Sequence, residues 1–119
     1  MLSKKEILEK LKPQVVAHRI DALDADISIR RMPMSERIEI EEAFLETIDG
    51  EEGKKKVLPK DFQRLQATIA VIAMVDDAGE QLFDSVDELY CLAGPVQSIV
   101  SEAYMVATGS KEPKKSKAD

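Results

Sequence analysis

The sequence predicts an α+β fold that is mainly α, with four to five helices packed with a small N-terminal β-hairpin. Three observations predict this class. The stretch 67–75 is apolar on every side, two segments near the N-terminus look extended, and capping residues mark the starts of several helices. With 119 residues, 44% hydrophobic and 4% aromatic, the chain fits one domain with a core of Ile, Leu, Val, Met and Ala.

The N-terminal part supplies the first helix and the hairpin. Ser3 and Glu6 form a capping-box pair that opens a short helix. Residues 15–20 and 27–31 are predicted to be strands, with a turn at 21–25 between them. A two-stranded hairpin is marginal in water on its own, so we expect it to pack against helices.

The central helix carries the strongest signal. It is predicted to begin at Pro59 or Asp61 and to run to Val75, and its last nine residues have no polar side. Such a helix must be covered by the fold or by a partner. It is also too short to cross a membrane, which takes about 20 residues. An Asp-Asp pair follows and is interpreted as turn residues.

The remaining helices are predicted from their caps. Ser35 should cap a helix that runs through Thr47, and a loop at 49–56 should follow. Ser85 should open a short helix, and Pro95 should begin the last one.

Charge is distributed unevenly along the chain. The formal net charge is −6, of which the last ten residues contribute about +2, so residues 1–109 carry about −8. An acidic body repels a phosphate backbone, so no nucleic-acid partner is expected. Residues 1–109 are predicted to be a single helical domain with a β-hairpin, and residues 110–119 a disordered basic tail. One cysteine excludes an internal disulfide, and the charged start predicts no export signal, so we expect a cytoplasmic location without membrane contact.

The titratable residues form no recognisable catalytic pattern. His18 is the only histidine and is predicted to lie at the surface or in a turn, whereas Cys91 is predicted to pack in the core. Asp21, Asp24 and Asp26 have the spacing of the front of a calcium loop but lack its glycine and its final glutamate, so they are interpreted as a solvated hairpin turn. We therefore expect a binding protein and no enzyme, cofactor or metal site.

Three segments together resemble tail assembly chaperones of long-tailed, siphovirus-type bacteriophages. They are Ile27–Arg37 at a strand-to-helix junction, Leu65–Phe83 with its acidic glycine turn, and the capped Ser85–Leu89. The resemblance covers about residues 15–108. The Gly94-Pro95 break departs from the pattern of that family.

The resemblance implies a non-virion protein of the host cell cytoplasm that binds the tape measure protein and promotes tail tube polymerisation around it. It also implies a homo-oligomer, and a longer form made by ribosomal frameshifting whose extension recruits the tail tube protein. Pro113-Lys114-Lys115 can be encoded by an A-rich heptamer on which a ribosome could slip back one base.

Four residues are candidates for partner binding: Met32 and Met34 at the strand-to-helix junction, and Ile72 and Met74 on the central helix. Flexible methionine side chains suit adaptable surfaces. Two alternative functions remain open. One is a head-to-tail joining or minor tail structural protein that stays in the particle, and the other is an acidic inhibitor or DNA mimic that uses the charge of the body.

Overall fold

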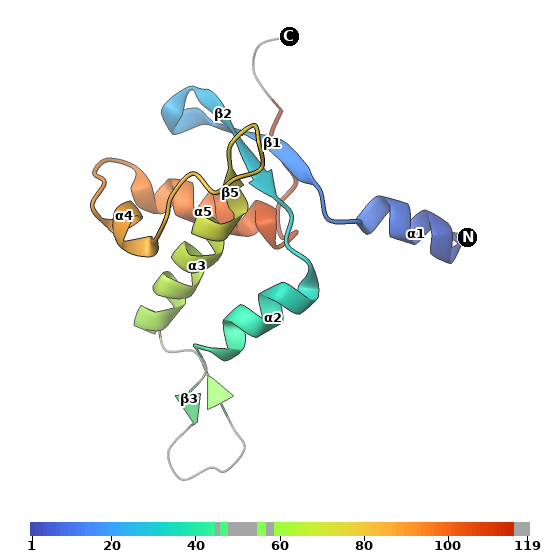
Figure 1. Ribbon diagram of the computed structural model, residues 1–119, viewed down its shortest axis with the longest axis horizontal. Helices are drawn as coiled ribbons and strands as arrows, with labels where there is room; N and C mark the ends of the chain where they lie inside the picture. The colour runs from blue at the N-terminus through green and yellow to red at the C-terminus, as the bar shows by residue number, and fades with distance from the viewer. Residues whose placement is uncertain (45, 48–54, 57–58, 116–119) are drawn as a thin grey trace.

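The computed structural model describes residues 1–44, 46–47, 55–56 and 59–115. Within them the elements follow the order α1 (Lys4–Leu11), β1 (Val15–Ile20), the 3₁₀ turn η1 (Asp21–Leu23), β2 (Ala25–Arg30), α2 (Met34–Glu42), β3 (Glu46–Thr47), β4 (Lys55–Lys56), α3 (Pro59–Ala73), β5 (Met74–Val75), α4 (Val86–Tyr90) and α5 (Val96–Ala107). Figure 1 shows the helices gathered around one small sheet, with α1 standing away from them. The predicted α+β, mainly α class is confirmed.

The N-terminal hairpin is confirmed, but its second strand begins at Ala25 and ends at Arg30 instead of spanning 27–31. Strands β1 and β2 pair antiparallel from Val15 opposite Arg30 to Ile20 opposite Ala25. Asp24 adopts the left-handed conformation (φ 51°) at the end of η1, which aspartate tolerates better than most residues do. The turn therefore closes without a glycine.

The central helix ends earlier than predicted and becomes a strand. Helix α3 stops at Ala73, and Met74 and Val75 extend along β2, opposite Ile29 and Ser28. The sheet thus has three strands in the order β1-β2-β5. An unbroken apolar run carries no mark of this change, because a buried helix and a buried strand both demand apolar residues on every side.

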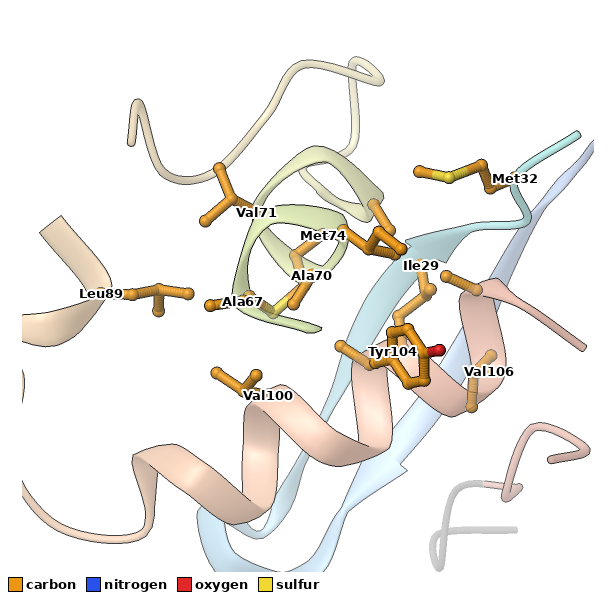
Figure 2. Close-up of a cluster of buried hydrophobic side chains, with 14 of the residues drawn as sticks. Ile29, Met32, Ala67, Ala70, Val71, Met74, Leu89, Val100, Tyr104 and Val106 are labelled. Atoms are coloured by element: carbon orange, nitrogen blue, oxygen red, sulfur yellow. The ribbon is translucent and has the colours of Figure 1, made fainter. Parts of the chain in front are cut away.

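The core lies between α3, α5 and the sheet (Figure 2), where side chains from α3 and α5 point toward each other and toward Ile29 of β2. Ile29, Ile69, Ala70, Ala103 and Val106 are completely buried. The prediction that 67–75 must be covered is confirmed, since only Thr68 and Ile72 of that stretch keep partial exposure.

Helix α2 begins and ends earlier than predicted. Pro33, not Ser35, is the N-cap residue, because its extended backbone (φ −60°, ψ 147°) leads directly into the first turn. The helix ends at Glu42 rather than Thr47, since the next two residues close it with tight i→i−3 hydrogen bonds. Thr47 belongs to β3 instead.

The loop predicted at 49–56 also requires a correction. Lys55 and Lys56 form β4, opposite Thr47 and Glu46 of β3. The rest of that loop, residues 49–54, lies outside the described residues.

The C-terminal helices follow their predicted signals. The Ser85 side chain accepts the Glu88 amide N–H at 3.3 Å and opens α4. Pro95 is the N-cap of α5 rather than its first helical residue. After α5, Gly109 has φ +80° and its N–H returns to the carbonyl of Val106, a helix exit that glycine adopts without steric cost.

We predict that Ile69→Asp prevents folding. An unpaired carboxylate at this fully buried position costs several kcal/mol, comparable with the whole stability of a small domain. Gln63→Asp, at an exposed position of the same helix, is the matched control and should retain a cooperative thermal transition. A cooperative melt of Ile69→Asp near that of wild type, followed by circular dichroism, would contradict the assignment of this core.

Candidate functional site

An open groove with an apolar lining lies between α2 and α3. We call it the α2–α3 groove; its volume is about 450 Å³ and it is lined by Arg37, Ile38, Glu41, Glu42, Phe62, Leu65 and Tyr104. Leu65 and Tyr104 are buried at its base, whereas Ile38 and Phe62 are exposed. Phe62 meets Tyr104 edge to face, with ring centroids 6.2 Å apart. The groove therefore has an aromatic wall.

Charged side chains fix the outer wall of the groove. The Arg37 Nε donates to Glu41 Oε2 at 2.8 Å, one turn along α2. At the start of the helix, the Arg30 guanidinium makes two hydrogen bonds to Glu36, at 2.8 and 3.1 Å. This pairing lowers the pKa of Glu36 and ties α2 to β2. Helix α2 is thereby held in place with its acidic side toward solvent.

Sequence reasoning missed this groove because α2 carries apolar residues on two sides. Ile40 faces inward and packs against the core. Met34 and Ile38 lie one helical turn apart on the outer side, where both are exposed. A helical wheel of α2 separates these two sides and places Met34 and Ile38 on a second apolar face.

The four predicted contact residues end up in different environments. Met34 is 65% exposed and extends the outer apolar face of α2 beyond the groove. Met74 is buried in the core at 1% exposure, so its side chain cannot meet a partner in this fold and that assignment must be corrected. Met32 also packs in the core and keeps only 9% exposure, at a pocket that it lines with Leu11 and Ala107, so it offers a partner little surface. Ile72 is half-buried and packs against the same core. Met74 is buried because it belongs to β5, the strand at the end of the apolar run, which pairs with β2.

Helix α1 is the second exposed apolar surface. It has the predicted capping box, in which Ser3 Oγ accepts the Glu6 amide N–H and Glu6 returns the bond to Ser3. None of its residues is buried against any described part of the chain, and Figure 1 shows it extending away from the body. Leu8 and Leu11 remain 60% and 76% exposed. A helix of this kind is unusual unless something covers its apolar side.

His18 is buried, which contradicts the predicted surface or turn position. Its side chain is 0% exposed, and its Nε2 lies 2.9 Å from Glu102 Oε1 of α5. The backbone N–H of Lys114 donates to His18 Nδ1 at 2.8 Å. Because Nδ1 accepts this bond, the ring proton belongs on Nε2, where it donates to Glu102. The imidazole is therefore a structural link between β1, α5 and the C-terminal segment.

The C-terminal segment 110–115 is bound to the body, so the prediction of disorder is wrong for these residues. The Lys114 carbonyl accepts the N–H of Arg19 at 2.9 Å, and its side chain binds Asp21. The side chain of Lys114 and, to a smaller extent, that of Arg19 bind the Asp21 carboxylate and lower its pKa. Lys111 donates to Glu102 at 2.6 Å. Residues 116–119 of the predicted tail lie outside the described residues.

The other titratable residues behave as follows. Asp21 and Asp24 both pair with the Arg19 guanidinium and stay exposed, as the interpretation of a solvated hairpin turn requires. Asp76 is a turn residue as predicted, because its side chain accepts the N–H groups of Ala78 and Glu80. Cys91 is exposed rather than packed in the core, since it follows the last turn of α4.

Two further findings concern the described residues as a whole. No group of three or more His, Cys, Asp or Glu among them is arranged to hold a metal ion. No helix among them combines the length and the apolar character needed to cross a membrane.

Comparison with protein-family models, with curated proteins and with solved structures gives no match for this chain. The geometry of the α2–α3 groove and of helix α1 therefore carries the functional inference.

We predict that Glu102→Gln lowers stability at neutral pH by about 1 kcal/mol, because the charged acceptor of His18 and Lys111 is lost. Lys111, and after it His18, hold the pKa of Glu102 below its ordinary value of 4.5. The carboxylate therefore stabilises the fold above pH 4.5, and this contribution is lost as the pH falls through the lowered pKa. Urea unfolding from pH 7 to pH 3 should show the gap between wild type and variant closing, and a constant gap would contradict this linkage.

Proposed function

We propose that this chain is a tail assembly chaperone of a long-tailed bacteriophage, which binds the tape measure protein in the host cell cytoplasm and promotes tail tube polymerisation around it. The observation that carries the proposal is the α2–α3 groove, continued along α2 by Met34. The resemblance of Ile27–Arg37 and Leu65–Phe83 to that family supports it. The proposed action is reversible binding without catalysis.

The groove suits an apolar helix better than it suits a small molecule. It is open along one side, and its apolar contacts come from exposed side chains on two helices. An amphipathic partner helix could place successive apolar residues against Phe62, Ile38 and Met34 while its polar side stays in water. A tape measure protein is a long helical rod rich in apolar residues, and many copies bound along it would act by avidity.

The bound C-terminal segment suggests how a longer form would be displayed. A slip at the codons for Lys114 and Lys115 would keep the contacts of Lys114 with His18 and Arg19. A frameshifted extension that recruits the tail tube protein would then leave the body beside β1, at a fixed point. It would therefore lie apart from the proposed cargo groove, whose lining comes from α2, α3 and α5.

We predict that Met34→Glu and Ile38→Glu each weaken capture of the tape measure protein about tenfold or more. Each places a charge where an apolar contact of roughly 1.5–3 kcal/mol is expected. Leu92→Glu is the matched control, because Leu92 is similarly exposed but lies beyond α4. The measurement is co-purification with co-expressed tape measure protein, with circular dichroism to confirm folding.

Further measurements separate the proposal from its alternatives. A chaperone should be absent from purified virions, whereas a head-to-tail joining or minor tail protein should be present in them. Binding to a basic nucleic-acid enzyme that disappears in high salt would favour the acidic mimic. Wild-type protein that fails to capture the tape measure protein would contradict the chaperone function.

A further inference from the structure

The buried imidazole of His18 has both ring nitrogens hydrogen-bonded to segments far along the chain. It is the sole histidine of the sequence. Its Nδ1 atom accepts the backbone N–H of Lys114 at 2.8 Å, and its Nε2 atom donates to Glu102 Oε1 at 2.9 Å. This pair of bonds exists only for the neutral ring, because a protonated imidazole carries N–H groups at both nitrogens and accepts no hydrogen bond. The protonation state of His18 therefore decides whether the Lys114 N–H has an acceptor.

Lys114 attaches the end of the described chain to β1 (Figure 1). While its N–H donates to His18, its carbonyl accepts the N–H of Arg19 at 2.9 Å. Its side chain adds an ion pair with Asp21, which is largely exposed, so water screens this contact. We call residues 112–115 the C-terminal strap. Its attachment to β1 depends on the two backbone hydrogen bonds of Lys114.

The other contacts of this region do not involve His18. Just before the strap, the N–H groups of Ser110 and Lys111 both donate to the carbonyl of Met105 in α5, at 2.8 and 3.2 Å. Within the strap, Glu112 lies 3.6 Å from Arg31 and is 92% exposed, so this ion pair is weak. Loss of the Lys114 bonds therefore frees the strap while the residues before it stay in place on α5.

The charged groups near His18 offer no substitute for the lost acceptor. Glu102 is the one carboxylate that the described residues place within hydrogen-bond distance of the ring, and its Oε1 atom also binds the Lys111 ammonium at 2.6 Å. Strand β2 places Ile27 opposite His18, and Asp26 points to the other face of the sheet. The remaining charged side chains beside this site pair with one another, Arg19 with Asp21 and Asp24, and Lys114 with Asp21. A protonated ring would share Glu102 with a lysine and leave Lys114 unpaired.

We propose that His18 is a pH-sensitive switch that holds the C-terminal strap on β1 while its ring is neutral and releases it when the ring is protonated. Protonation at Nδ1 removes the acceptor and turns two N–H groups toward each other, so the Lys114 bond must break. Histidine ordinarily changes charge between about pH 5 and 8, whereas carboxylates titrate near pH 4. Mild acid therefore acts on His18 alone. The switch does not depend on the proposed chaperone function.

The test is amide hydrogen exchange of the full-length protein, followed residue by residue by NMR. Measurements are made at about pH 7.5 and about pH 5.5, on either side of the pH at which histidine ordinarily titrates. The protection factors of the Lys114 and Arg19 amides, corrected for intrinsic exchange, should fall about tenfold or more at the lower pH, because each loses its hydrogen bond. The Ile69 amide in the core should keep its protection. Equal protection of Lys114 at both pH values, or a parallel loss at Ile69, would overturn the proposal.

Two substitutions locate the effect on the ring. His18→Asn supplies a neutral amide oxygen near the position of Nδ1, so it should keep Lys114 protected at both pH values. His18→Gln carries its amide near the position of Nε2 instead and should leave Lys114 unprotected at both. Asp21→Asn is the matched control, because it removes the ion pair of Lys114 and should preserve the pH dependence. A pH dependence that persists in His18→Asn would overturn the assignment to His18, and the wild-type measurement decides the matter should that variant fail to fold.

Discussion

The fold depends on one constraint, which is that the stretch 67–75 has no side that tolerates water. Helix α5 covers it along one side and the sheet continues it, while α4 and α2 close the remaining sides. Ile69 and Ala70 lose all exposure as a result. Met74 and Val75 satisfy the same constraint as a strand, where their backbone groups pair with β2 instead of with a further helical turn. The elements that cover this stretch also set the position of α2, and with it the groove.

The predictable features were those encoded by local chemistry. The cap at Ser3, the alternation along β2 and the apolar central run each act within a few residues, so the sequence shows them directly. His18 could not be placed in this way, because its burial depends on Glu102 and Lys114, far along the chain. Cys91 lies in the apolar run 89–93, but it follows the last turn of α4 and is exposed. The groove was missed for a related reason, since α2 divides its apolar residues between two sides.

The molecule has a well-buried core and two apolar surfaces that remain exposed, the α2–α3 groove and helix α1. Met32 and Met74 pack inside, with exposed fractions of 9% and 1%. Ile38 and Phe62 stay accessible although a small domain gains stability by burying such residues. Exposed apolar residues at these positions, with an acidic rim beside them, favour a binding role over a purely structural one.

The contact between His18 and Lys114 joins residues separated by 96 positions. Such a contact can form only after nearly all of the described chain has been synthesised, so β1 must wait for its last backbone and side-chain partners. Until then the imidazole of His18 lacks the Lys114 N–H, and the Arg19 N–H has no acceptor from this segment. During translation the hydrogen bonds between β1 and the C-terminal segment are therefore among the last contacts to form, although β1 is the first strand to leave the ribosome.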